Sequence, residues 1–265
     1  MISRRTLLTA VSSVATMAAW RASAQAYKPN QIIAGDSPGV ISNYAYFNAS
    51  GVIVACATTA STASCGQKPL LVLTGDMGVV ASKLSFLASD YRVVGIDRKR
   101  GTVQDLAFMG PWIGLMKNAS AVIHLAGIFG DDLEDIQQNN FTATGNVIRA
   151  CKIHSIPKII YSSSVQAEPA KYGRKDTHGP RPSDWYGAGK RFTEDLLSVY
   201  AKTSGCATTA IRLGAVPHPG ATQHDPSYPD NITMSDDQVA KVFRAALTNA
   251  LGFTLVEPTL EWAKP

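Results

Sequence analysis

Residues 183–194 read SDWYGAGKRFTE and place a tyrosine and a lysine, Tyr186 and Lys190, four positions apart. On a helix this spacing brings both side chains to one face. Tyrosine, with an ordinary pKa near ~10, is a poor base at neutral pH, but a neighbouring ammonium favours its phenolate form. The pair therefore predicts proton transfer to or from a substrate hydroxyl. Because Tyr-x-x-x-Lys is also common by chance, the alternative is one exposed face of an ordinary helix.

A run of serines precedes this pair along the chain. Residues 157–164 read PKIIYSSS, a predicted strand that ends in Ser162, Ser163 and Ser164. A serine hydroxyl from a neighbouring strand end would position the same substrate oxygen that the tyrosine protonates. The serines therefore favour the catalytic interpretation of the Tyr-Lys pair.

A glycine-containing loop, TGDMGVVA, follows the apolar run 70–74. Gly75 and Gly78 would permit a tight turn and close approach of the backbone to a pyrophosphate, and the next helix would offer its N-terminal amides. Asp97 lies nineteen residues after Gly78, near the ~20 expected of a carboxylate that binds the adenine ribose. This carboxylate favours NAD, although Arg98 beside it would tolerate the 2′-phosphate of NADP. The alternative is a strand-turn-helix that binds no dinucleotide.

The elements that must position these residues alternate between strand and helix. Apolar runs bounded by glycine, proline or polar residues predict strands at 70–75, 91–97, 120–127, 157–164, 206–214 and 252–258. Helices are predicted at 79–88, 133–154, 186–202 and 235–251, the last beginning with a capping box of Ser235 and Gln238. The alternation predicts an α/β fold, a parallel sheet with helices on both faces.

The composition suits a globular chain of 265 residues, with 45% apolar and 17% charged residues. The net charge of +5 is modest, and part of it lies in the first five residues and in the segment DRKRG. No nucleic-acid surface is therefore expected. No Cys/His grouping has the spacing of a zinc site, so no metal is predicted.

The first 26 residues have the order of an export signal. Two arginines are followed by an apolar run from Leu7 to Trp20 and then by small residues at A-x-A spacing. The segment SRRTLL resembles a twin-arginine signal, which predicts export to the periplasm and no membrane anchor once the signal is removed. The alternative is an uncleaved anchoring helix, for which the run is short.

Residues 27–67 are punctuated by proline, glycine and asparagine and predict a loosely structured extension or linker before the domain at 68–265. An oxidising compartment would permit a disulfide between Cys56 and Cys65 across a short loop. The alternative is that all four cysteines of the chain, which include Cys151 and Cys206, are unpaired thiols.

Seven ordered motifs between about residue 70 and residue 213 resemble the short-chain dehydrogenase/reductase superfamily, in its extended epimerase/dehydratase branch. Four of them are the glycine loop, Asp97, the serine strand and the Tyr-Lys pair. The other three are Asp105-Leu106, the segment HLAG at 124–127 and the segment NNFTATGNVIRAC, in which Asn140 takes the first position of the family motif. Two positions depart from the family pattern. Asp76 puts a charge inside the loop that would oppose the pyrophosphate, and Ala81 replaces the third glycine.

The resemblance implies a Rossmann-type doubly wound sheet with a small C-terminal substrate region, and an NAD(P)-dependent oxidoreductase or epimerase. It implies Ser164 as the residue that orients the hydroxyl, Tyr186 as the acid/base, and Lys190 as its electrostatic partner and ribose anchor. The implied cofactor contacts are Gly75, Asp76, Met77, Gly78, Asp97, Arg98, Asp105, Leu106, Leu125, Ala126, Gly127, Asn140, Ser162, Tyr186 and Lys190. The implied substrate contacts are Ser164, Val165, Gln166 and Arg212. Family members often dimerise through two helices that include the Tyr-Lys helix, so a homodimer is expected by analogy.

Within this branch the chain is most similar to uronate dehydrogenases, which oxidise a hexuronic acid at C1 with NAD. The segments RPSDWYGAGKRFTEDLL, IRLGAVPHP and SDDQVAKVF carry the similarity. Val165 and Gln166 stand where those enzymes have Asn-His. The similarity implies a small sugar or sugar acid that reacts as a secondary alcohol, hemiacetal or ketone, with Arg212 as either a carboxylate contact or a structural residue.

A non-catalytic nucleotide-binding or interaction protein that kept the fold is the competing hypothesis. Export favours it, because free NAD is scarce outside the cytoplasm and an enzyme that exchanges NAD would lack cofactor there. An enzyme that keeps its NAD through an internal redox cycle would not be limited in this way. The presence of Ser164, Tyr186 and Lys190 together favours the enzyme.

Overall fold

The computed structural model describes residues 45–47, 53–55, 68–101, 104–173, 181–217 and 232–258. The chain divides into two units, Met1–Gly66 and Gln67–Pro265. In the first unit β1 (Ala45–Phe47) pairs antiparallel with β2 (Ile53–Ala55). The predicted export signal and the cysteines Cys56 and Cys65 lie outside the described residues. Within the described residues, no helix is both long and apolar enough to cross a bilayer.

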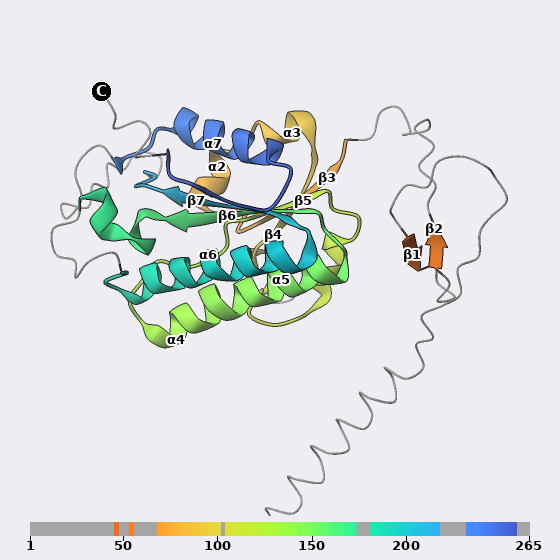
Figure 1. Cartoon of the computed structure of the whole chain (residues 1–265), viewed down its shortest axis with the longest axis horizontal. Coiled ribbons are helices and arrows are strands. Elements are labelled where there is room, and N and C mark those ends of the chain that lie inside the picture. The colour runs from red at the N-terminus through yellow and green to blue at the C-terminus, as the bar shows by residue number, and fades with distance from the viewer. Residues whose placement is uncertain are drawn as a thin grey trace, which may run out of the picture. The chain divides into compact units, whose positions relative to one another are not determined.

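The second unit is built on a sheet of six strands in the order β4-β3-β5-β6-β7-β8, and every neighbouring pair is parallel (Figure 1). The strands are β3 (Leu70–Thr74), β4 (Arg92–Ile96), β5 (Ala121–His124), β6 (Lys158–Ser164), β7 (Ala207–Leu213) and β8 (Phe253–Val256). All residues of β3, β5 and β7 are buried, as expected for strands covered on both faces. The predicted parallel α/β fold is confirmed.

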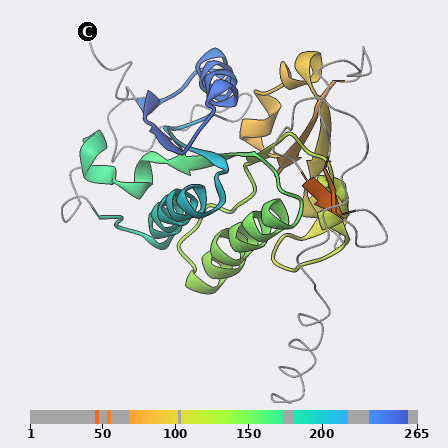
Figure 2. The same ribbon diagram turned by 45° about the vertical axis from the view of Figure 1, so that its right-hand side comes forward.

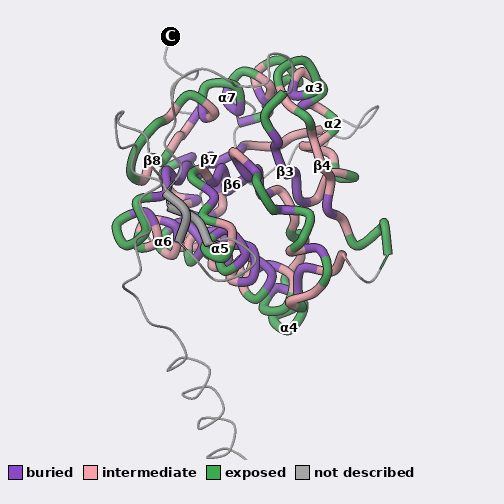
Figure 3. Tube along the Cα trace, turned by 90° about the vertical axis from the view of Figure 1, so that its right-hand side faces the viewer, coloured by how far each residue is buried: buried purple, intermediate pink, exposed green. Residues whose placement is uncertain are grey.

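Helices cover both faces of this sheet (Figure 2). One face carries α5 (Ala143–Ile153) and α6 (Trp185–Ser204), and the other carries α2 (Val79–Ser82), α3 (Leu87–Asp90) and α7 (Asp236–Thr248). Each face has its own apolar core, and Figure 3 shows the buried residues concentrated in the strands and in the helix faces turned toward them. The predicted capping box at the start of α7 is present.

The first predicted helix, over 79–88, is wrong as a single helix, because it divides into the two short helices α2 and α3. The break follows Ser82, whose hydroxyl donates to the carbonyl oxygen of Val79 at 2.7 Å. The backbone bonds then change to the tighter three-residue spacing, from Lys83 to Val80 and from Leu84 to Ala81. Serine hydroxyls that compete for backbone carbonyls weaken helices in this way. The glycine loop is therefore followed by a helix of one turn.

The second predicted helix is present but contains an insertion. Between α4 (Leu133–Ile136) and α5, residues Gln137–Thr142 form a π-helical segment with the buried Asn140 inside it. Such segments widen a helix locally and are frequent at functional sites.

The chain leaves β3 for β4 on one side and returns to β5 on the other, and binding sites of doubly wound sheets lie at such a switch point.

Candidate functional site

The glycine loop begins at the carboxyl end of β3. Gly75 has a φ of 70°, in the left-handed region that favours glycine, and its amide donates to the carbonyl oxygen of Ile96 at 2.8 Å. A Cβ on Gly75 would lie 2.7 Å from the backbone nitrogen of Ala126. The amide of Gly78 donates to the carbonyl oxygen of Gly75 at 3.0 Å, which closes the turn. Both conformation and close packing therefore require glycine at position 75.

Asp76 does not leave an unpaired charge in this loop. Its carboxylate forms an ion pair with Arg100 at 2.5 Å and lies against Gly95, where a Cβ would be 2.0 Å from Asp76 Oδ2. The carboxylate raises the pKa of Arg100 through a hydrogen bond and charge attraction. The expected opposition to a pyrophosphate is therefore corrected: Arg100 offsets the charge, and the absent side chain of Gly95 gives the carboxylate its space.

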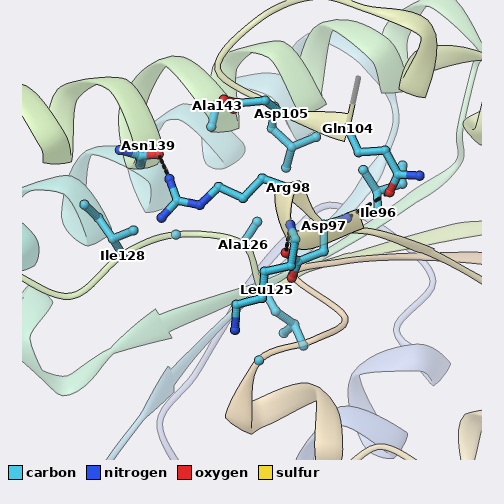
Figure 4. A pocket seen from close by; sticks show the side chains of 15 residues that line it. Ile96, Asp97, Arg98, Gln104, Asp105, Leu125, Ala126, Ile128, Asn139 and Ala143 are labelled. Atoms are coloured by element: carbon cyan, nitrogen blue, oxygen red, sulfur yellow. Dashed lines mark hydrogen bonds between the residues drawn. The ribbon is translucent and has the colours of Figure 1, made fainter. Parts of the chain in front are cut away.

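A cavity of about 290 Å³ lies beside the loop, and we call it the loop cavity (Figure 4). Asp97 forms part of its wall and accepts hydrogen bonds from the amides of Met77 at 3.3 Å and Lys99 at 2.9 Å. Since a carboxylate offers about four acceptor positions, two remain for ribose hydroxyls. Arg98 reaches across to Asn139, its guanidinium donating to the amide oxygen at 2.8 Å.

Nine of the predicted cofactor contacts line the loop cavity. They are Gly75, Gly78, Asp97, Arg98, Asp105, Leu106, Leu125, Ala126 and Gly127. Of the others, Asp76 faces Gly95, the exposed Met77 contributes its amide to Asp97, and Asn140, Ser162, Tyr186 and Lys190 lie away from the lining. Gln104 also lines the cavity and accepts from the amide of Asp97 at 3.2 Å. No sequence motif had indicated Gln104.

Asn140 holds the segment that follows β5. Its amide oxygen accepts from the backbone nitrogen of Ile128 at 2.8 Å, and its amide nitrogen donates to the carbonyl oxygen of the same residue at 3.0 Å. The amide oxygen and the amide nitrogen of the buried side chain are therefore both hydrogen-bonded to the backbone of Ile128. This geometry gives Asn140 a role in positioning the cavity wall at Gly127 and Ile128, and its contact with a cofactor stays a prediction.

A second cavity, also of about 290 Å³, contains the predicted catalytic hydroxyls, and we call it the serine-tyrosine cavity. Ser164 ends β6 and is buried, and its Oγ accepts from the amide of Gln166 at 3.2 Å. Tyr186 lies in the first turn of α6, and its ring meets that of Phe129 edge-on, 5.0 Å between centroids. The complete lining is Val80, Phe129, Ser162, Ser163, Ser164, Val165, Gln166, Tyr186, Leu213, Gly214, Ala215, Val216 and Ile232.

The start of α6 is fixed tightly against β6. Asp184 caps the helix by accepting from the amide of Gly187 at 2.6 Å, a contact typical of helix N-termini. A Cβ on Gly187 would lie 2.3 Å from the carbonyl oxygen of Gln166. The absent side chain thus lets the strand end and the helix start approach closely, one residue after Tyr186.

Lys190 lies between residues that line the two cavities, although it belongs to neither lining. Its ammonium donates to the carbonyl oxygen of Ser162 at 2.7 Å and lies 5.3 Å from the ring centroid of Tyr186. It would also lie 3.9 Å from a Cβ on Gly127, which lines the loop cavity. Burial lowers the pKa of Lys190 to about 8, and the charge of Glu194 opposes this shift. The ammonium form is therefore present at neutral pH beside the tyrosine.

Replacing Lys190 with methionine is expected to stabilise the cofactor-free protein at pH 7. The pKa of Lys190 is lower in the folded than in the unfolded chain, 10.5, so the buried ammonium destabilises the fold below about pH 8. The lost free energy of unfolding is recovered as the pH rises from 8 to 10.5. At 1.36 kcal/mol per pKa unit, the shift of Lys190 lowers the free energy of unfolding by about 3 kcal/mol at most. Urea unfolding should show Lys190→Met more stable by about 1–3 kcal/mol at pH 7, with the difference shrinking by pH 10. A difference in unfolding free energy between Lys190→Met and wild type that does not change with pH would contradict the buried ammonium as its cause.

His124, in the HLAG segment, is a structural residue. Its ring nitrogens contact the hydroxyls of Thr74 at 2.6 Å and Thr144 at 3.0 Å. Burial, with a smaller effect from the charge of Lys190, lowers the pKa of His124 to about 3. The ring is therefore neutral and links β3, β5 and α5 beneath the site.

Arg212, a predicted substrate contact, lies outside both cavities. Its guanidinium binds Glu194 through two nitrogens at 2.9 and 2.8 Å, and its Nη1 binds Glu168 at 2.6 Å and Glu257 at 2.9 Å. The side chain is 1% exposed. Ser163 joins the same group by donating to Glu194 at 2.5 Å. Of the two roles considered for Arg212, this geometry favours the structural one.

Besides Gln104, three residues that shape the site were given no role from the sequence. Gly95 makes room for Asp76, Phe129 covers Tyr186, and Glu194 joins α6 to Arg212. The four-residue spacing of Tyr186, Lys190 and Glu194 could have indicated that Glu194 shares the face of the catalytic pair.

Comparison with known proteins identifies the family. Residues 71–235 match the model of the NAD dependent epimerase/dehydratase family. A uronate dehydrogenase of Pseudomonas putida is 29% identical over 162 residues, which cover 57% of each chain. One of Pseudomonas syringae pv. tomato is 28% identical over 179 residues, 66% of this chain and 63% of the relative. The matches thus span about 57 to 63% of the length of these two curated relatives.

Solved structures show the same fold. Uronate dehydrogenase from Agrobacterium tumefaciens superimposes with a TM-score of 0.58 at 24% identity, covering 72% of this chain and 76% of that one. UDP-N-acetylglucosamine 4-epimerase from Methanobrevibacter ruminantium, in complex with UDP-N-acetylmuramic acid, gives 0.58 at 20% identity, with 72% and 77% covered. With the family model covering more than half of its residues, this chain belongs to the NAD-dependent epimerase/dehydratase family.

Proposed function

We propose that this protein is an NAD-dependent oxidoreductase or epimerase that acts on a secondary alcohol, hemiacetal or ketone of a small sugar or sugar acid. The observation that carries the proposal is the position of Lys190, whose ammonium lies between the carbonyl of Ser162 and the ring of Tyr186, beside the wall of the loop cavity. Ser164 and Tyr186 line the adjoining serine-tyrosine cavity. This arrangement supports proton transfer at the tyrosine hydroxyl.

The residues around the loop cavity fit a dinucleotide. Gly75 and Gly78 would hold the pyrophosphate close to the backbone, and Asp97 keeps two acceptor positions for the adenine ribose. Bound NAD would supply a hydride acceptor. The chain's own part is to hold the substrate hydroxyl at Ser164 and to remove its proton at Tyr186. The nearby ammonium of Lys190 favours the phenolate that accepts this proton.

We also propose that the protein is exported in folded form by the twin-arginine route. Purified protein from the exported fraction should release NAD, rather than NADP, when it is denatured and analysed by mass spectrometry. Near-equimolar NAD would favour an enzyme loaded before export that cycles its cofactor internally. A protein that is empty and also fails to bind added NAD or NADP would favour the competing non-catalytic function.

The homodimer stays a prediction. It is supported by three exposed apolar side chains at seven-residue spacing on α6, which are Trp185, Phe192 and Val199.

A further inference from the structure

The described walls of the serine-tyrosine cavity combine apolar side chains with uncharged polar side chains. Val80, Phe129, Val165, Leu213, Val216 and Ile232 contribute apolar side chains, and serine, glutamine and tyrosine contribute the polar groups. None of the described lining residues is an aspartate, glutamate, histidine, lysine or arginine. An unpaired carboxylate is costly to remove from water, so such walls disfavour an acidic substrate.

The two buried cations near this cavity already have partners. Arg212 binds the carboxylates of Glu168, Glu194 and Glu257. Releasing it toward a substrate would leave three carboxylates without their shared cation. Lys190 donates to the carbonyl of Ser162 and is needed beside Tyr186. Neither cation is therefore available to bind a carboxylate in the cavity.

Gln166 supplies the polar group that the cavity leaves unused. Its side-chain oxygen Oε1 is buried and has no hydrogen-bond partner among the residues that the structure describes, and the residue lines the cavity. The backbone of Gln166 is fixed on both sides, because its amide donates to Ser164 at 3.2 Å and its carbonyl packs against Gly187. An amide oxygen accepts hydrogen bonds, so its natural partner is a hydroxyl. A carboxylate at neutral pH has no hydrogen to donate.

We infer that the serine-tyrosine cavity selects an uncharged sugar, one of whose hydroxyls donates to Gln166 Oε1, over the corresponding sugar acid. This inference rests on the proposed function and specifies its substrate class. It separates this chain from the uronate dehydrogenases that it resembles in sequence, because the preferred substrate would be the neutral sugar and not the acid.

Matched sugar pairs test the inference directly. The full chain with NAD would be assayed with glucose against glucuronate and galactose against galacturonate, which differ only in a hydroxymethyl or a carboxylate group at C6. We expect kcat/KM to favour a neutral sugar by about 100-fold or more over its acid. Equal values, or a preference for the uronates, would overturn the inference.

Substitutions at Gln166 show whether this residue causes the preference. Gln166→Leu removes the acceptor at similar size and should reduce the preference for the neutral sugar at least tenfold, with NAD binding unchanged. Gln166→Glu keeps an acceptor but adds a charge, so it should retain discrimination against the uronate. Unchanged selectivity in Gln166→Leu would contradict the role of this residue.

The proposed function can fail separately from this inference. If neither member of a pair is oxidised, calorimetric titration of the NAD-loaded protein with each sugar should still show tighter binding of the neutral sugar than of its acid. Absence of binding by both neutral sugars would overturn the inference. NAD binding itself, measured in the same titrations, tests the cofactor site independently of the sugar.

Discussion

Tyr186→Phe is expected to lower turnover by a factor of about 10² to 10⁴ while NAD binding stays near the wild-type value. The substitution removes only the hydroxyl that exchanges a proton with the substrate, and general acid–base groups typically contribute factors of this size. The aromatic contact with Phe129 and the position of the ring beside the Lys190 ammonium are retained. Steady-state kinetics and a titration with NAD would separate the two effects.

A matched control is available on the same helix. Tyr200 lies near the other end of α6, where it packs on the apolar core and lines neither cavity. Tyr200→Phe should therefore retain activity. Near-wild-type turnover in Tyr186→Phe would exclude the tyrosine as the acid/base and would contradict the proposed mechanism.

Arg212→Met is expected to destabilise the protein by about 3–5 kcal/mol. The guanidinium is 1% exposed and is shared by Glu168, Glu194 and Glu257. Its removal would leave the buried carboxylate of Glu194 without the cation that binds it, and an uncompensated buried charge costs about this much. The free energy of unfolding, measured by urea denaturation at pH 7, should show the loss.

The pH dependence and a surface pair provide controls for this prediction. Burial raises the pKa of Glu257, but hydrogen bonds from Lys171 and Tyr172 and the charges of Lys171 and Arg212 lower it overall. Stability from this carboxylate is therefore present above its unfolded pKa and lost as the pH falls, so the difference between Arg212→Met and wild type should narrow in acid. Arg244→Met breaks an exposed contact with Asp90 at 3.6 Å and should change stability by less than about 1 kcal/mol. A similar effect of the two substitutions would contradict the buried-cluster interpretation.

The sequence was informative wherever local chemistry determines structure. The apolar runs predict all six strands of the large sheet, and Ser235 with Gln238 predicts the start of α7, because periodicity and capping act over a few residues. The motif that contains Gly75 and Gly78 predicts the turn after β3 for the same reason. The division of the helix over 79–88 was not predicted, since it depends on a competition between backbone and serine hydroxyls that apolar periodicity does not reveal.

Side-chain partners set by distant segments could not be predicted. The three carboxylates around Arg212 come from positions 168, 194 and 257, and no local pattern shows that they meet. The same is true of Asp76, whose charge was expected to oppose a pyrophosphate but is paired with Arg100. The unpartnered oxygen of Gln166 likewise depends on packing among β6, α6 and the segment that follows β7.

The single face of α6 that carries Tyr186, Lys190 and Glu194 has a consequence for motion. Lys190 and Glu194 are bonded to consecutive serines of β6, through the carbonyl of Ser162 and the hydroxyl of Ser163. Turning the helix far enough to withdraw the tyrosine would break both contacts together. In native-state hydrogen exchange, the amides at the start of α6 and at the end of β6 should therefore open as one cooperative unit, with a common free energy of opening.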